Sequence, residues 1–236
     1  METFKYTPEY EIDPLIESLA EPIRKIIDKV RNDLDSGQFS VIIGEDASGR
    51  LPALIFKDIV DFFNSECGEE KSKIYFLAGS KDLSFEQSEK KIQQIIEFLK
   101  SKNLPSAVAG KKVLIVTDQV STGQSLTPLI RAFESMGIDY EIAALHVLQI
   151  VDSIAEVDTL DDLQRKFGDK LHWGITGETP IFNRRDLGGV IKNTAELHAS
   201  ALRKVEEVDP DTVNNNVRKS REAKTRVVEK IIEEIA

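Results

Sequence analysis

The sequence is poor in cysteine, with one thiol, Cys67, among 236 residues. A single thiol cannot form a disulfide within the chain, and cysteine-rich zinc sites need several thiolates. Histidine is also scarce, and His146, His172 and His198 lack the spacing of metal ligands. His146 lies in an apolar stretch, where a histidine is more often a satisfied core residue than a ligand. We therefore assign Cys67 and the histidines no role in chemistry.

Long hydrophobic runs and excess positive charge are missing as well. The longest nearly apolar stretch, residues 142–151, is interrupted by His146 and Gln149 and is too short to cross a bilayer. The chain starts without a basic segment followed by an apolar run, so the expected location is cytoplasmic. Thirty-one basic against 41 acidic residues give a net charge of −10, which argues against binding of nucleic acid or anionic membranes by the whole surface.

Short apolar runs alternate with amphipathic segments along most of the chain. Strands are expected at residues 39–43, 73–78, 113–116, 141–147 and 171–175. The segments between them have helical spacing, which is typical of βαβ units. The sequence thus predicts an α/β fold with a mostly parallel, doubly wound sheet flanked by helices, and additional helices at both ends of the chain.

Helix boundaries are indicated by local signals. Asp13 and Pro14 predict the N-cap and first residue of a helix that Pro22 breaks into two pieces. Ser84 and Gln87 have the spacing of a capping box. Further helices are expected to begin at Ser125, with Gly137 after the end, and at Thr159.

Three regions follow from this pattern: an N-terminal helical segment (1–37), an α/β core (38–190) whose end near 168–190 forms a hood, and a charged C-terminal helical extension (191–236). Residues 213–230 of the extension contain six basic and two acidic residues. Two interpretations stay open for this helix. In one, it is a solvated helix docked through its apolar side chains. In the other, it is a local basic patch for a phosphate ligand, a nucleic acid or another partner. The side chains expected to dock are Val217, Val227, Ile231 and Ile235.

The loop after the third predicted strand has the composition of an anion-binding site. The buried strand delivers Asp118 to the carboxyl edge of the sheet, and small or polar residues then lead into a helix. Successive backbone N–H groups, hydroxyls and a helix N-terminus favour a phosphate at such a place. The other interpretation is an ordinary loop in which Ser125 caps the helix. The loop residues are Ser121, Thr122, Gly123, Gln124 and Ser125.

This segment resembles the signature of the type I phosphoribosyltransferases, which reads four apolar residues, two acids, a variable stretch and then Thr/Ser-Gly-x-Thr/Ser. The resemblance implies that Asp118, matching the second acid, is the catalytic-site carboxylate that binds the ribose hydroxyls of phosphoribosyl pyrophosphate (PRPP). It also implies that residues 121–125 bind the 5-phosphate. Thr117 stands in place of the first acid. The loss of one charged hydrogen-bonding partner is expected to weaken ribose binding roughly ten- to a hundred-fold.

A second loop, after the first predicted strand, resembles the pyrophosphate loop of that family. Ser48 and Gly49 offer backbone donors, and Arg50 has a guanidinium suited to phosphate oxygens. Glu45 and Asp46 are expected either to hold Mg²⁺ through water or to form only a charged turn. The resemblance therefore implies Mg²⁺ bound through the substrate's pyrophosphate, and no metal held by protein ligands alone.

The remaining expected contacts lie further along the chain. Lys81 is placed to meet the leaving pyrophosphate or is simply exposed to solvent. The segment 173–187 is weakly similar to the base-binding end of the purine salvage branch. This implies stacking of Trp173 or Phe182 on the base and contact of Arg185 with pyrophosphate. Core packing explains the two aromatic residues equally well.

The leading functional hypothesis is a Mg²⁺-dependent glycosyltransferase that transfers a 5-phosphoribosyl group to a nitrogenous base and releases pyrophosphate. The alternative is an inactive sensor or regulator of the same fold that binds a phosphosugar or nucleotide. A third hypothesis is an interaction protein that recruits RNA or a protein through residues 213–230. The expected partner is a small phosphosugar or nucleotide, and the resemblance implies a homodimer. The base is not indicated.

Overall fold

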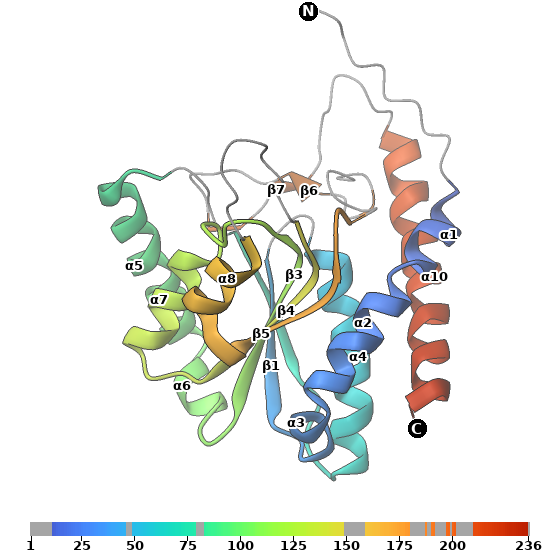
Figure 1. Cartoon of the computed structure of the whole chain (residues 1–236), viewed down its shortest axis with the longest axis horizontal. Coiled ribbons are helices and arrows are strands. Elements are labelled where there is room, and N and C mark those ends of the chain that lie inside the picture. Colours follow the sequence, from blue (N-terminus) through green and yellow to red (C-terminus); the bar gives the residue numbers. More distant parts are fainter. Residues whose placement is uncertain are drawn as a thin grey trace, which may run out of the picture.

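The computed structural model describes residues 11–45, 49–78, 83–148, 159–179, 187, 190–191, 197–198, 200–201 and 210–235. Its centre is a five-stranded, all-parallel sheet with the strand order β2-β1-β3-β4-β5 (Figure 1). The predicted α/β fold class is therefore confirmed. The strands are β1 (Phe39–Glu45), β2 (Lys73–Leu77), β3 (Lys112–Val120), β4 (Tyr140–Val147) and β5 (Leu171–Thr176).

Helices cover both faces of the sheet (Figure 1). One face carries α1 (Ile12–Glu17), α2 (Ala20–Lys29), α4 (Arg50–Glu66) and α10 (Pro210–Ile235), and α3 (Arg31–Asp35) follows α2. The other face carries α5 (Phe85–Ser101), α6 (Leu104–Ala107), α7 (Thr127–Ser135) and α8 (Thr159–Phe167). A 3₁₀ turn, η1 (Gly168–Lys170), precedes β5, and β6 (Val190–Ile191) pairs antiparallel with β7 (Ser200–Ala201).

Alternate residues of the central strands feed two separate cores. Ile42 of β1 and Leu114 of β3 are fully buried in the cluster that includes α2 and α4. Their chain neighbours Ile43 and Ile115 are fully buried in the cluster that includes α5 and α7. This double burial explains why the strands read as continuous apolar runs in the sequence.

The strand order reverses between β1 and β3. From β1 the chain crosses through α4 to β2 on one side, and then returns past β1 to add β3, β4 and β5 on the other side. In open parallel sheets, ligands bind outside the carboxyl ends of the strands at such a reversal. The topology alone therefore directs attention to the loops after β1 and β3.

The capping signals of the sequence are partly confirmed. Ser84 Oγ accepts from the Gln87 amide at 3.3 Å, and the Gln87 side chain accepts from the Ser84 amide at 2.9 Å, as the capping box predicts. The prediction that Ser125 caps a helix is wrong, because α7 begins at Thr127 and its N-cap is Leu126.

The first helices also differ from the prediction in detail. The expected N-cap, Asp13, lies inside α1, and the interruption falls at residues 18–19 rather than at Pro22. Pro22 is instead in the first turn of α2. A proline is tolerated there because the backbone N–H groups of a first turn have no intrahelical acceptor.

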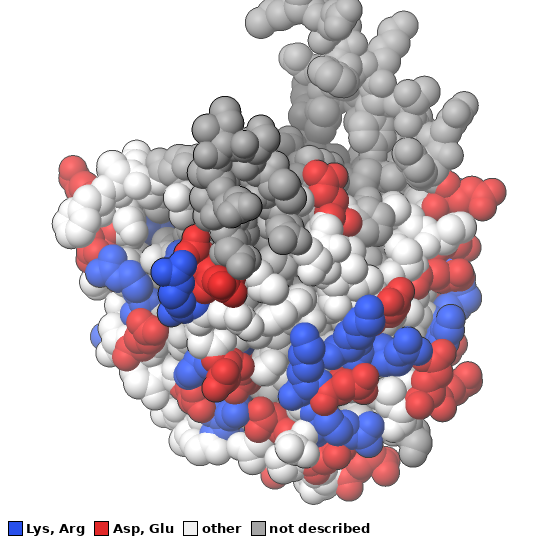
Figure 2. Space-filling model, viewed as in Figure 1, with Lys and Arg blue, Asp and Glu red and all other residues white. Residues whose placement is uncertain are grey.

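The C-terminal helix α10 is docked against α1 and α4, as one of the two interpretations predicted (Figure 1). Two of the expected docking residues, Val227 and Ile231, are buried, and Val217 and Ile235 are partly buried. Three of its basic side chains form ion pairs: Arg218 with Glu222, Lys224 with Asp58, and Arg226 with Asp13. Figure 2 shows acidic and basic side chains interleaved across the visible face.

None of the helices in the described ranges combines the length and apolarity needed to cross a membrane.

Candidate functional site at the β1–β3 switch point

Two carboxylates and one hydroxyl are buried where β1 and β3 end. Asp118 is 2% exposed, Glu45 is 6% exposed and Thr117 is fully buried. Thr117 Oγ1 donates a hydrogen bond of 2.8 Å to Glu45 Oε2. Strand β1 therefore places the Glu45 carboxylate beside Thr117, the residue that stands in place of the expected first acid. The sequence separates Glu45 and Thr117 by 72 positions, so no local motif signals their contact.

Gly49, the residue before α4, lies close to the sheet. A Cβ atom at this position would lie 3.0 Å from the Val116 carbonyl oxygen, and closer still to the Glu45 carbonyl oxygen. Backbone atoms cannot yield as a flexible side chain does, so a larger residue would displace the chain at this point. Gly49 thus allows the start of α4 to lie against the backbone of both β1 and β3.

Arg50 begins α4 beside this glycine. Its guanidinium lies over the Phe76 ring, 4.5 Å from the centroid, and such stacking restricts its orientation. The structure thus places Gly49 and Arg50 at the switch point. The other residues expected in this loop, Asp46 and Ser48, lie outside the described residues, as does Lys81.

The loop after β3 turns through a glycine and is tied to the helix that follows it. Gly123 has a φ of +65°, in the region that residues with a side chain rarely adopt. Thr127 Oγ1 donates to the Gly123 carbonyl at 3.0 Å, and the Gln124 amide donates to Thr122 Oγ1 at 3.4 Å. These bonds fold the loop onto the first turn of α7.

The far side of this loop packs against α8. A Cβ atom on Gly123 would lie 2.5 Å from Cε2 of Phe167, whose ring is buried. The opposite side of the loop is accessible: Thr122 and Gln124 are exposed, and Ser121 and Ser125 are half-buried. The loop is therefore supported by packing on one side while it presents polar groups on the other.

Lys166 of α8 adds a positive charge that the sequence did not indicate. Its Nζ donates to the Thr122 carbonyl at 3.3 Å and lies 5.2 Å from the centroid of the Phe167 ring. Burial lowers the pKa of this ammonium group. A lysine 44 positions from its contact carries no local signal, and only the fold brings it to the loop.

Trp173 lies within β5 rather than in the loop that follows it. It is in register with Ala144, which is in register with Thr117, so it stands two strands, or about 10 Å, from Thr117 of β3. Lys29 Nζ lies 4.2 Å from the centroid of the Trp173 ring and donates to the Trp173 carbonyl at 2.7 Å. The Trp173 side chain is also partly buried against the core cluster that includes α5 and α7. Phe182 and Arg185 lie outside the described residues.

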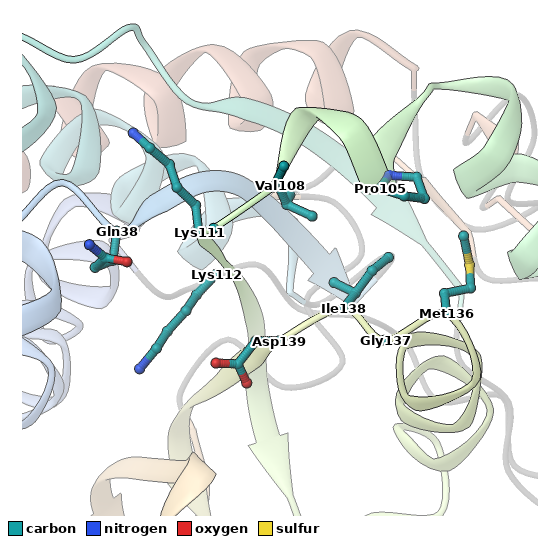
Figure 3. A pocket seen from close by; sticks show the side chains of 11 residues that line it. Gln38, Pro105, Val108, Lys111, Lys112, Met136, Gly137, Ile138 and Asp139 are labelled. Atoms are coloured by element: carbon teal, nitrogen blue, oxygen red, sulfur yellow. The ribbon is translucent and has the colours of Figure 1, made fainter.

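A cavity of about 360 Å³ lies at the opposite, amino edge of the sheet (Figure 3). Its two lysines are engaged in ion pairs: Lys112 with Asp33 at 2.9 Å and Glu141 at 2.8 Å, and Lys111 with Glu69. Burial would lower the pKa of Lys112, but its hydrogen bonds to Glu141 and Asp33 outweigh burial and raise the pKa. With both cations neutralised, this cavity is a poor match for an anionic ligand.

Within the described ranges, no group of three or more histidine, cysteine, aspartate or glutamate side chains is arranged to hold a metal ion. Glu45 and Asp118 still provide carboxylate oxygens of the kind that Mg²⁺ accepts through water.

Comparison of the chain with known protein families and with curated proteins finds no match.

Proposed function

We propose that this chain is a phosphoribosyltransferase-like protein that binds PRPP or a nucleoside monophosphate at the β1–β3 switch point. We further propose that it transfers the 5-phosphoribosyl group to a nitrogenous base with release of pyrophosphate. One observation carries the proposal: the loops through Gly49 and Gly123 follow the two strands between which the strand order reverses. Gly49 and Gly123 lie too close to neighbouring protein atoms to carry a Cβ atom, and ligands of open parallel sheets bind outside the carboxyl ends of the strands at such a reversal.

The proposed roles follow from position. Residues 121–125, with the Lys166 ammonium beside them, bind the 5-phosphate. Asp118 accepts hydrogen bonds from the ribose hydroxyls, and Gly49 and Arg50 face the pyrophosphate. Mg²⁺ carried in with the substrate's pyrophosphate would neutralise charge on the leaving group.

Glu45 is proposed as the second carboxylate for the ribose. The type I signature places its first acid at position 117, where this chain has threonine. The Thr117 hydroxyl lies 2.8 Å from a Glu45 carboxylate oxygen, so the neighbouring strand supplies negative charge to the same place. Thr117 then acts as a positioning residue that fixes the Glu45 carboxylate by donating to it.

The reaction demands little covalent chemistry from the protein. The bond between C1 of the ribose and the pyrophosphate oxygen breaks, and its electron pair leaves with the pyrophosphate. A lone pair of the base nitrogen forms the new bond to C1, and the nitrogen's proton passes to solvent. Catalysis of such a step rests on alignment of the reactants and on stabilisation of charge in the transition state.

A sensor that binds the same ligands without turnover is the second candidate. It is favoured by Thr117, because this substitution removes a carboxylate from the type I signature. In that case the Glu45–Thr117 hydrogen bond is only structural.

Pyrophosphate release separates the two candidates. Purified protein is given PRPP, Mg²⁺ and, in turn, adenine, guanine, hypoxanthine, xanthine, uracil and orotate. An enzyme releases pyrophosphate with at least one base, and Asp118→Asn suppresses this release. A sensor binds PRPP or a nucleotide in calorimetry and releases none. Absence of both binding and release would contradict the proposal in either form.

A further inference from the structure

Polar side chains from β3, β4 and the segment after β5 gather beside the proposed ribose site. His146 of β4 is in register with Gln119, the residue after Asp118. After β5 the chain turns back across these ends. The Gly177 amide donates to the Val147 carbonyl at 2.8 Å, and the Thr179 amide donates to Gln119 Oε1 at 3.2 Å. Thr179 therefore lies over β3, and Gly177 lies over β4.

Two atoms of this group are buried without a hydrogen-bond partner. His146 is 6% exposed and Thr179 is 4% exposed. Within the described part of the chain, neither His146 Nδ1 nor Thr179 Oγ1 makes a hydrogen bond. Folded proteins pair nearly all buried polar atoms, so two unpaired atoms on residues that both adjoin Gln119 require an explanation. His146 lies in the core, as expected, but its Nδ1 atom has no hydrogen-bond partner among the described residues.

The environment of His146 favours the neutral imidazole. Burial lowers the pKa of His146, and a hydrogen bond with the Gly177 backbone opposes this effect only partly. In a neutral imidazole one ring nitrogen carries a hydrogen and the other is a bare acceptor. His146 Nδ1 can therefore accept from a ligand or donate to it, according to the tautomer, and Thr179 Oγ1 can also do either.

We propose that His146 and Thr179 form the subsite for the polar edge of the ligand's base; this inference rests on the proposed function. Neighbouring strands lie about 4.8 Å apart, and side chains alternate between faces along a strand, so His146 lies one strand from Gln119 and on the same face as Thr117, which donates to Glu45. The edge of a base carries N–H donors beside carbonyl or ring-nitrogen acceptors, so it supplies partners of either kind for the two atoms.

Binding of ribose 5-phosphate and of nucleoside 5′-monophosphates tests the subsite, because only the nucleotides carry a base. The probes are ribose 5-phosphate, AMP, GMP, IMP and UMP, titrated by calorimetry into four variants. His146→Leu removes the ring nitrogens, and His146→Asn keeps a polar atom near the Nδ1 position. Thr179→Val removes the hydroxyl at nearly constant volume, and Thr179→Ser keeps it.

The subsite predicts that wild type binds at least one nucleotide more tightly than ribose 5-phosphate. His146→Leu and Thr179→Val should each weaken that nucleotide about tenfold and leave ribose 5-phosphate within twofold of wild type. Thr179→Ser and His146→Asn should retain most of the nucleotide affinity. Without ligand, Thr179→Val should unfold at the same temperature as wild type or higher, because it replaces a hydroxyl that has no partner.

Two results would overturn the subsite. Unchanged nucleotide affinity in both His146→Leu and Thr179→Val would mean that the nucleotide bonds to neither of the two atoms. Equal loss of nucleotide and ribose 5-phosphate would mean a general structural effect. If wild type binds neither ligand, nor PRPP with Mg²⁺, then the proposed function itself fails. If wild type binds ribose 5-phosphate and nucleotides equally well, then only the base subsite fails.

Discussion

Gly123 meets two constraints at once, and they can be separated by mutation. Its φ of +65° disfavours any side chain, and the Phe167 ring occupies the space where a Cβ atom would lie. Gly137, after α7, has the same φ of +65° with nothing within 4 Å of the Cβ position. The two glycines thus share a backbone conformation and differ in their surroundings.

Gly137→Ala is expected to lower the free energy of unfolding by about 1–2 kcal/mol through backbone strain alone. Gly123→Ala should lower it by about 2–5 kcal/mol, because the clash with the ring adds to the strain. Urea unfolding monitored by circular dichroism measures both. Gly123→Ala should also weaken phosphate binding, whereas Gly137→Ala should not. Equal losses of stability would show that the contact with Phe167 is unimportant.

The Glu45–Thr117 contact can be tested by removing the carboxylate at position 45 of β1 and introducing one at position 117 of β3. Glu45→Ala should weaken binding of PRPP roughly ten- to a hundred-fold, because one charged hydrogen-bonding group is lost. The double variant Glu45→Ala/Thr117→Asp places a carboxylate at the position of the missing acid and should recover part of that affinity. Calorimetry with PRPP and Mg²⁺ provides the measurement.

Thr117→Val is the control for the positioning role, since it keeps the shape of the side chain and removes the donor to Glu45. It should weaken binding less than Glu45→Ala does. PRPP affinity that is unaffected by Glu45→Ala would remove Glu45 from the site and leave its hydrogen bond to Thr117 a purely structural one.

At the scale of single elements, the sequence predicted most of what is local. All five strands and the capping box of α5 depend on residues close in the chain, and the structure confirms them. The start of α7 was predicted wrongly because serine is a good N-cap in general, but the loop here continues to Leu126. The contacts of Glu45 with Thr117 and of Lys166 with Thr122 join distant segments, and no local pattern encodes them.

Helix α10 also shows that a local pattern predicts less than the tertiary contacts. Its apolar periodicity predicted which side would dock, and Val227 and Ile231 are indeed buried. The surface that receives it, formed with α1 and α4, could not be read from that periodicity. The ion pair between Lys224 and Asp58 of α4 could not be predicted from that periodicity either.

The docking of α10 predicts that its two adjacent isoleucines differ in importance. Ile231 is fully buried, whereas Ile232 is only partly buried. Ile231→Ala is expected to lower the free energy of unfolding by about 2–5 kcal/mol. Ile232→Ala, the matched control, should lower it by less than half as much. Thermal and urea unfolding compare the two. Equal small effects would indicate that α10 contributes little to the core.

For the molecule as a whole, buried carboxylates predict acid sensitivity. Burial alone would raise the pKa of Glu141, but hydrogen bonds from His172 and Lys112 outweigh it and lower the pKa. Burial would also raise the pKa of Asp61, but hydrogen bonds from Lys57 and Ser72 outweigh it and lower the pKa. A group whose pKa is lower in the folded state stabilises above its unfolded pKa and loses this contribution as pH falls.

The free energy of unfolding is therefore expected to fall as pH decreases below about 4.5, the ordinary pKa of a glutamate. Urea titrations at pH 7, 5, 4 and 3.5 measure the change. Glu141→Gln should be less stable than wild type at pH 7 and should show a shallower decline below pH 5. A decline as steep as that of wild type would mean that Glu141 does not contribute to the acid sensitivity.

The measurement that bears most directly on the account is calorimetric binding of PRPP with Mg²⁺ to wild type and to Asp118→Asn. The Asn side chain keeps the shape of a residue that is 2% exposed and removes its negative charge. The account predicts micromolar binding by wild type and a loss of ten-fold or more in Asp118→Asn. Equal binding by the two proteins would place the ligand elsewhere, and no binding by folded wild type would contradict the proposed ligand altogether.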